Sequence, residues 1–267
     1  IGLILGVGLL TLKILIGNEN PTMILEHFTN LSIRWTLIGF ACIGLYWGIE
    51  TIIQYLLVER IHKGNKLWNS FKVVMSGHFF NAITPFASGG QPMQAFMMMK
   101  QGVPLGSSAS VLLSKFIIYQ LTLTLYSMIV LIVQLKFFVV KVKGIAYLSL
   151  VGFTVNLGVV IVLVMAAFMR KRTKKIGFWG INLLHKFHLI KDVYSEKKKL
   201  IKQVDLFGNN IDEMKKNKML IARIGVLTAS QLTAYFLIPY AVYRAFGLKG
   251  AQVLVIVSAA AFIVMFS

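Results

Sequence analysis

Glu50 and Lys115 are charged residues within apolar stretches of the sequence that are long enough to cross a membrane. A charge at that depth is costly, so it is a candidate for function. Counted at about 1.5 Å per residue from the predicted cytoplasmic ends of their helices, both residues lie roughly 12 Å deep. Equal depth predicts an ion pair. It would either join two helices or serve a substrate- or proton-linked role, unless Lys115 simply extends to the membrane surface.

Polar side chains accompany this pair of charges. Gln54, Tyr119 and Gln120 lie within about one helical turn of Glu50 or Lys115. We expect a polar cavity here, although glutamine and tyrosine also hydrogen-bond neighbouring helices in membrane proteins.

A second candidate site is the polar stretch at residues 81–92, whose sequence is NAITPFASGGQP. The apolar arms at 71–80 and 93–99 are each too short to cross a bilayer, which takes about 20 helical residues. The sequence therefore predicts a re-entrant helical hairpin over residues 71–100. Irregular backbone within a bilayer must face protein or a water-filled cavity.

The second arm of this hairpin has the features of an anion site. Pro92 suits the first turn of a helix, and Gly89 and Gly90 let the backbone approach a ligand closely. The free N–H groups at such a helix start would suit a lipid phosphate. Additional hydrogen bonds could come from Thr84, Ser88, Gln91 and Gln94. The alternative is a plug whose polar groups are satisfied within the hairpin.

The overall composition indicates how these residues are positioned. Hydrophobic residues make up 57% of the chain and charged residues only 14%, whereas charged residues approach about a quarter of a soluble domain. The fold class is thus an all-α polytopic membrane protein forming one domain over residues 1–267. Cys42 is the single cysteine, so no intrachain disulfide is possible. We expect no metal and no cofactor, because His185 and His188 have no evident third ligand.

About six spans are predicted, in addition to the hairpin. They cover residues 1–16 (the end of a first span), 35–58, 108–135, 145–168, 219–246 and 251 onward. The basic segment at 169–218 is cytoplasmic by the positive-inside rule, since residues 170–218 carry 14 Lys and Arg against 5 Asp and Glu. This topology holds only if both ends of the hairpin lie on the cytoplasmic side.

The basic segment also contains an amphipathic helix. Leu200, Val204, Phe207, Ile211 and Met214 recur at steps of three and four residues. This helix is either a surface helix packed on the cytoplasmic mouth or an interfacial helix or gate that touches lipid headgroups. The net charge of +19 is therefore interpreted as topology and lipid contact, not as nucleic-acid binding.

Residues 84–94 (TPFASGGQPMQ), followed by KQGV at 100–103, resemble the lysylphosphatidylglycerol synthase transmembrane-region family. This family is also called flippase-like and includes the membrane part of the multiple peptide resistance factor type. Many members carry Glu at the position of Gln91, Arg at that of Gln94 and Arg at that of Lys115. The resemblance implies that the hairpin is one half of an inverted pseudo-repeat. A chain that starts with Ile and stops within an apolar run is expected to be a piece of a longer protein.

The function implied by the resemblance is translocation of an anionic or aminoacylated phospholipid, or a lipid-linked glycan, across the bacterial cytoplasmic membrane. The headgroup would meet residues 89–94 and Lys115, and Glu50 would hold Lys115 when the site is empty. One alternative is lysyl transfer to phosphatidylglycerol, which confers antimicrobial peptide resistance and needs a soluble domain that the basic segment is too short to form. Another alternative is a non-transporting scaffold for envelope enzymes. The expected partners are membrane lipids, and a second copy of the chain is a further candidate.

No motif of soluble enzyme chemistry is present in the sequence. It contains no Walker loop, no HExxH and no GxSxG. An ATPase or hydrolase within this chain is therefore not expected.

Overall fold

The computed structural model describes residues 31–134, 170–186, 192–250 and 252–266, together with single positions 152, 154, 158 and 161. Helices and short turns account for these residues, and no strand occurs among them. The helices, in chain order, are α3 (Ile33–Ile61), α4 (Leu67–Ile83), the 3-10 turn η1 (Pro85–Ala87), α5 (Gly90–Lys100), α6 (Leu105–Val133), α9 (Arg170–Lys186), α10 (Val193–Lys216), α11 (Lys218–Ala245) and α12 (Val253–Phe266).

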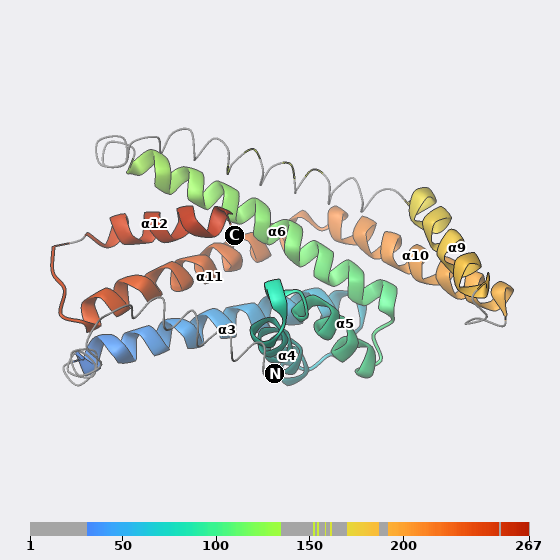
Figure 1. Ribbon diagram of the computed structural model, residues 1–267, viewed down its shortest axis with the longest axis horizontal. Coiled ribbons are helices and arrows are strands. Elements are labelled where there is room, and N and C mark those ends of the chain that lie inside the picture. Colours follow the sequence, from blue (N-terminus) through green and yellow to red (C-terminus); the bar gives the residue numbers. More distant parts are fainter. Residues whose placement is uncertain are drawn as a thin grey trace.

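Three long helices, α3, α6 and α11, run along the long axis of the molecule (Figure 1). Each is long and apolar enough to cross a membrane. The predicted spans at 35–58, 108–135 and 219–246 are therefore confirmed as membrane-capable helices, with ends shifted by a few residues. The predicted last span begins as α12, while the predicted spans at 1–16 and 145–168 lie outside the described residues, apart from the four single positions.

Helices α3 and α11 form a closely packed antiparallel pair. The Ser32 N–H donates to the Ala245 carbonyl at 2.9 Å, which joins the start of α3 to the end of α11. Gly39 faces Ala241 in this contact, and a Cβ at position 39 would lie 3.7 Å from the Ala241 Cβ, an ordinary van der Waals distance. Near this end the Arg244 guanidinium lies 5.1 Å above the Trp35 ring. Small residues thus lie at the contact between the two helices, as is usual in membrane proteins.

Helices α4 and α5 are the two arms of the predicted hairpin. The Gln101 amide nitrogen Nε2 donates to the Asn69 carbonyl at 3.1 Å, so the end of the second arm is bonded to the start of the first. Both arms join the bundle at the end where α3 finishes and α6 begins (Figure 1). The two ends of the hairpin therefore lie at the same end of the bundle. The second arm starts at Gly90, two residues before Pro92, and Pro92 lies within its first turn as predicted.

The predicted amphipathic helix is the greater part of α10. Three residues of its apolar face are buried: Val204, Ile211 and Met214. Helix α10 packs on the first half of α6. The Gly106 N–H donates to Gln203 Oε1 at 2.8 Å, and Ser114 Oγ donates to Met214 Sδ at 3.1 Å. The arrangement agrees with a surface helix packed against the bundle, one of the two interpretations drawn from the sequence.

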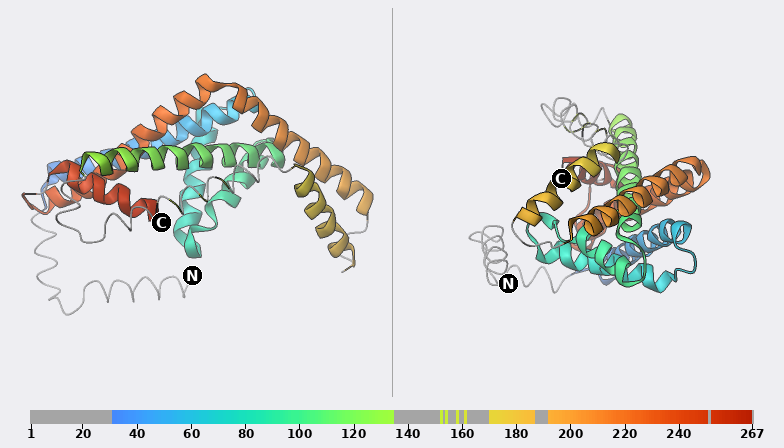
Figure 2. Two further views of the ribbon diagram at one scale, coloured as in Figure 1. Left: turned by 90° about the horizontal axis from the view of Figure 1, so that it is seen from above. Right: turned by 90° about the vertical axis from the view of Figure 1, so that its right-hand side faces the viewer.

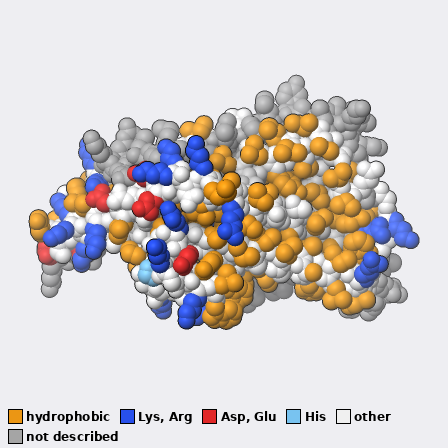
Figure 3. Space-filling view, turned by 180° about the vertical axis from the view of Figure 1, so that it is seen from behind, with side chains coloured by type: hydrophobic (Ala, Val, Ile, Leu, Met, Phe, Trp, Pro, Cys, Tyr) orange, Lys and Arg blue, Asp and Glu red, His pale blue; other side chains and the backbone are white. Residues whose placement is uncertain are grey.

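Charge is distributed unevenly along the long axis. In Figure 3, Lys and Arg side chains gather at the end that holds α9 and α10, a smaller group lies at the opposite end, and a broad hydrophobic surface separates them. Exposed apolar residues of α3, α6 and α11 include Leu37, Phe40, Leu125, Ile129 and Val226. A hydrophobic band between two polar ends is the surface expected of a membrane-spanning bundle.

Candidate functional site

A cavity of about 230 Å³ lies where α3, the hairpin, α6 and α11 meet. Its lining is mixed, with aromatic and aliphatic side chains beside charged and amide groups. The polar members are Tyr46, Glu50, His78, Asn81, Gln91, Gln94, Lys115, Tyr119, Thr228 and Gln231. Ligand pockets often have this character, with a few polar groups converging in an apolar enclosure.

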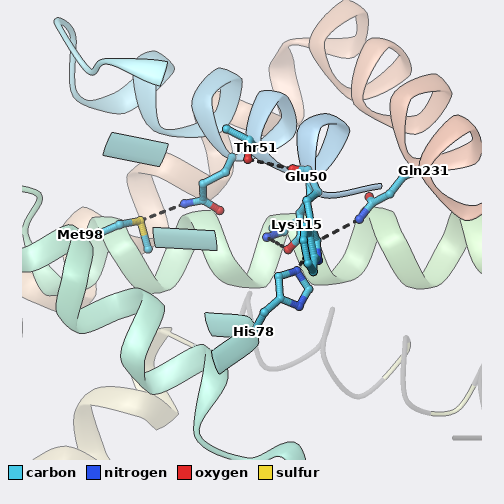
Figure 4. Close-up of polar contacts among 8 residues, drawn as sticks. Glu50, Thr51, His78, Met98, Lys115 and Gln231 are labelled. Carbon is cyan, nitrogen blue, oxygen red and sulfur yellow. Dashed lines mark hydrogen bonds and ion pairs between the residues drawn. The ribbon is translucent and has the colours of Figure 1, made fainter. Parts of the chain in front are cut away.

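The Glu50 carboxylate is the centre of the polar groups in this cavity, and three other elements supply its partners (Figure 4). Lys115 Nζ of α6 donates to Oε1 at 2.6 Å, and His78 Nε2 of α4 lies 2.8 Å from Oε2. The Gln231 amide of α11 donates to the same Oε2 at 3.4 Å. Glu50 itself is only 6% exposed, so these contacts satisfy a carboxylate that is almost fully removed from solvent. The predicted pairing of Glu50 with Lys115 is confirmed.

Lys115 is the more open partner of the ion pair, since its side chain is 17% exposed against 8% for Glu50. An anion that enters the cavity could therefore reach the ammonium group while His78 and Gln231 keep contact with the carboxylate.

The tip of the hairpin is satisfied largely from within. The Gly89 N–H donates to Thr84 Oγ1 at 2.9 Å, and the Gly90 N–H donates to Asn81 Oδ1 at 2.8 Å. The sequence predicted free N–H groups at this helix start, whereas these two are already bonded. A ligand phosphate would have to displace Thr84 or Asn81 in order to use them. The structure thus agrees with the alternative of an internally satisfied hairpin at these two groups.

The first turns of α5 contribute amides to the cavity. Gln91 and Gln94 line it, and Gln94 is 8% exposed. Gly77 of α4 makes room for the Gln94 side chain, since a Cβ at position 77 would lie 2.2 Å from Gln94 Nε2. Close contact between the two arms therefore positions an uncharged hydrogen-bonding group beside the charged cluster.

The structure brings together six of the nine residues that the sequence suggested for substrate binding: Glu50, Gly90, Gln91, Gln94, Lys115 and Tyr119. The other three, Thr84, Ser88 and Gly89, do not line this cavity. Thr84 Oγ1 donates to the Phe80 carbonyl at 2.6 Å, and Ser88 Oγ donates to the Pro85 carbonyl at 2.9 Å. Both hydroxyls stabilise the turn around η1.

Sequence reasoning missed several residues of the cluster. His78 was not proposed as a site residue, yet it contacts Glu50 directly. Gln231 was not proposed, although it is a polar side chain within an apolar span. Asn81 was included only as the start of the polar stretch at residues 81–92 and was not proposed to bind substrate. Their grouping depends on how α4 and α11 approach α3, and helical spacing within one segment does not contain that information.

Gln54 lies one turn beyond Glu50 on α3 but does not line the cavity. Its amide nitrogen donates to Met98 Sδ at 3.2 Å, and sulfur is a weak acceptor. Its Oε1 is buried without a hydrogen-bond partner in the described part of the chain. Polar type and spacing along α3 therefore do not by themselves mark a residue as part of the site.

The structure describes one member of the histidine pair for which the sequence offered no third metal ligand. His185 lies on α9, and His188 lies outside the described residues. Within the described ranges, no three His, Cys, Asp or Glu side chains are close enough together to hold a metal ion.

The apolar surface, the long spans and the buried charges define a multi-pass helical membrane protein. The chain belongs to the family described as the lysylphosphatidylglycerol synthase TM region, whose match covers residues 1–267. It is also similar to a "UPF0104 membrane protein" from Archaeoglobus fulgidus, at 24% identity over 107 residues. That match covers 36% of this chain and only 33% of the archaeal protein. No solved structure matches the chain.

Proposed function

We propose that this protein moves an anionic or aminoacylated phospholipid, or a lipid-linked glycan, between the leaflets of the bacterial cytoplasmic membrane. The observation that carries the proposal is the Glu50–Lys115 pair, which faces a cavity at the centre of the bundle. Glu50 lies eleven residues before the end of α3 at Ile61, which is about 16 Å along the helix. That is close to the middle of a hydrocarbon core about 30 Å thick.

The hairpin is proposed to be re-entrant, with its tip in the bilayer. Its two ends meet at the basic end of the molecule, and its tip supplies Asn81, Gly90 and Gln91 to the cavity. Irregular backbone would be stable at that depth, because the side chains of Thr84 and Asn81 accept hydrogen bonds from the N–H groups of Gly89 and Gly90. The cytoplasmic side is assigned to the basic end by the positive-inside rule.

A headgroup phosphate is proposed to bind Lys115 in exchange for Glu50. The ammonium would turn from the carboxylate to the phosphate, and Glu50 would keep its contacts with His78 and Gln231. Gln91 and Gln94 would donate hydrogen bonds to phosphate or to neutral headgroup oxygens. A cavity of about 230 Å³ suits a headgroup, so the acyl chains would stay in the surrounding bilayer.

The proposal is tested by leaflet exchange of a fluorescent, headgroup-bearing anionic phospholipid in vesicles that contain the purified protein. Lys115→Ala removes the phosphate partner, and Gly90→Leu pushes a side chain into the hairpin tip, where even a Cβ would lie 2.1 Å from Asn81 Oδ1. We expect Lys115→Ala to lower the exchange rate at least about tenfold, because a hydrogen bond to a charged group contributes about 1.5–3 kcal/mol. Gly90→Leu should lower the exchange rate as well, because its side chain would disturb the hairpin tip that borders the cavity.

Gly44→Ala is the matched control, since Gly44 lies on an exposed part of α3 and a Cβ there would meet nothing within 4 Å. Its exchange rate should equal that of the unaltered protein. The proposal is contradicted if Lys115→Ala and Gly90→Leu fold normally and still exchange lipid at the control rate. A protein that promotes no exchange for any headgroup offered would favour the scaffold alternative.

A further inference from the structure

Helix α9 exposes a stripe of apolar side chains that the fold does not use. Ile176 is 68% exposed, Trp179 67% and Leu183 39%. Their spacing of three and four residues places them on one side of the helix. Two exposed lysines, Lys175 and Lys186, border this stripe. Large exposed apolar side chains in a contiguous patch indicate a surface that is covered in the working protein.

The opposite side of α9 is already occupied by α10. Gly177 lies against Leu200 so closely that a Cβ at position 177 would be 2.3 Å from a Leu200 methyl group. Lys197 of α10 lies 5.6 Å above the Phe178 ring, and Lys174 pairs with Asp205 at 2.7 Å. The stripe therefore points away from the contact that holds α9 in the fold.

The position of α9 is that of a helix at a membrane surface. It lies beyond the ends of α3 and α6 and crosses the long axis of the spans, as Figures 1 and 2 show. It begins with Arg170, Lys171 and Arg172, directly after the span predicted at residues 145–168. A helix that leaves a span and then runs across its axis stays near the level where the span ends.

We propose that α9 lies in the cytoplasmic interface of the bilayer and binds anionic phospholipids. Ile176, Trp179 and Leu183 enter the boundary between headgroups and acyl chains, and Lys175 and Lys186 meet lipid phosphates. A basic helix with an apolar face that contains Trp is the type that binds this interface. The local excess of 14 basic over 5 acidic residues in 170–218 matches an anionic leaflet, to which each nearby Lys or Arg adds attraction.

This inference changes the interpretation of the amphipathic segment at 200–214. Its apolar face is covered by the bundle, because Val204, Ile211 and Met214 are all buried. Contact with lipid is assigned instead to α9, which the periodicity at 200–214 did not identify. The inference does not depend on lipid exchange, because a transporter and a scaffold could each anchor α9 in this way.

The test measures how deep the stripe lies in vesicles. In a Cys42→Ser background, a spin label is attached to the cysteine of Trp179→Cys. The measurement compares how often this label collides with oxygen and with a water-soluble nickel chelate. Lys198→Cys on exposed α10 is the matched water-facing control. The vesicles contain phosphatidylcholine alone or phosphatidylcholine with phosphatidylglycerol, and the same labelled protein is also measured in detergent.

We expect the position-179 label to collide with the nickel chelate at least about threefold less often than the position-198 label in phosphatidylglycerol vesicles, as for a side chain buried about 5–10 Å into the interface. Replacing both Lys175 and Lys186 with Gln should reduce this protection. Equal accessibility of the two labels in both kinds of vesicle would overturn the proposal. Low collision rates with both oxygen and the nickel chelate at position 179 would also overturn it, because a label in lipid stays accessible to oxygen and a label covered by protein is protected from both.

Discussion

The hairpin tip and the Glu50 cluster are both polar regions within an apolar bundle, and they differ in how their polar groups are satisfied. At the tip, the hydrogen bonds of Gly89 and Gly90 join groups within the hairpin. At the cluster, Glu50 of α3 contacts side chains from α4, α6 and α11. The tip thus fixes a backbone shape, and the cluster concentrates charge beside a cavity.

This difference separates two kinds of sequence signal. The glycine- and proline-rich motif at 84–94 is the more conspicuous signal, but several of its residues maintain the turn. The two charges in the spans are individually less conspicuous, and they form the part of the site that can attract an anion. A substitution at the tip should therefore act through structure, and a substitution at the cluster should act on both stability and transport.

The largest expected effect is that of Lys115→Ala. Breaking a buried ion pair by removing one partner costs about 3–5 kcal/mol, since among the described residues it leaves Glu50 with His78 and Gln231 as partners. We expect the free energy of unfolding in mixed micelles to fall by about that amount and lipid exchange to be lost. Lys115→Arg keeps the positive charge and should recover most of the stability.

Gly90→Ala should have the next largest effect. The added Cβ would lie 2.1 Å from Asn81 Oδ1, so the side chain that accepts the Gly90 N–H must move. Crowding of this kind costs about 1–3 kcal/mol. Thermal unfolding measured beside Gly44→Ala would show it, and equal stabilities for the two variants would mean that the tip is not closely packed.

Asn81→Ala should cost less, about 1 kcal/mol, because it removes the acceptor of one helix-start N–H without adding a clash. Gly44→Ala, where a Cβ would meet nothing within 4 Å, is the control for stability. If the alanine variant instead abolishes exchange and leaves unfolding unchanged, Asn81 binds substrate, and the division between tip and cluster is wrong.

Gln54→Met should have the smallest effect and the opposite sign. The buried Oε1 has no partner in the described structure, so an apolar side chain of similar length removes a desolvation cost. We expect the free energy of unfolding to rise by up to about 1 kcal/mol, with lipid exchange unchanged. A loss of exchange would show that the functional site extends along α3 past the cavity.

The helices could be predicted from the sequence because membrane spans follow from local composition alone. The spans at 35–58, 108–135 and 219–246 appear as α3, α6 and α11. Glu50 and Lys115 could be paired because depth along a helix follows from residue count. The hairpin could be located because apolar arms of about ten residues do not suffice to cross a bilayer.

Other features of the site depend on tertiary packing that no single segment encodes. His78 and Gln231 reach Glu50 only because α4 and α11 both approach α3. The N–H groups that were predicted to be free at the start of α5 are instead bonded to Thr84 and Asn81, since these two side chains fold back over the tip. Likewise, the exposed stripe of α9 becomes evident only once α10 is seen to cover the opposite face.

Exchanging the two charges of the pair tests the central claim most directly, because it separates an ion pair that holds helices together from one that receives a phosphate. The measurement is lipid exchange by the double variant Glu50→Lys/Lys115→Glu, beside its unfolding free energy. The account predicts that the double variant is more stable than Lys115→Ala but transports anionic lipid at least about tenfold more slowly than the unaltered protein. Recovery of both stability and full exchange would contradict the account, since the pair would then be structural only.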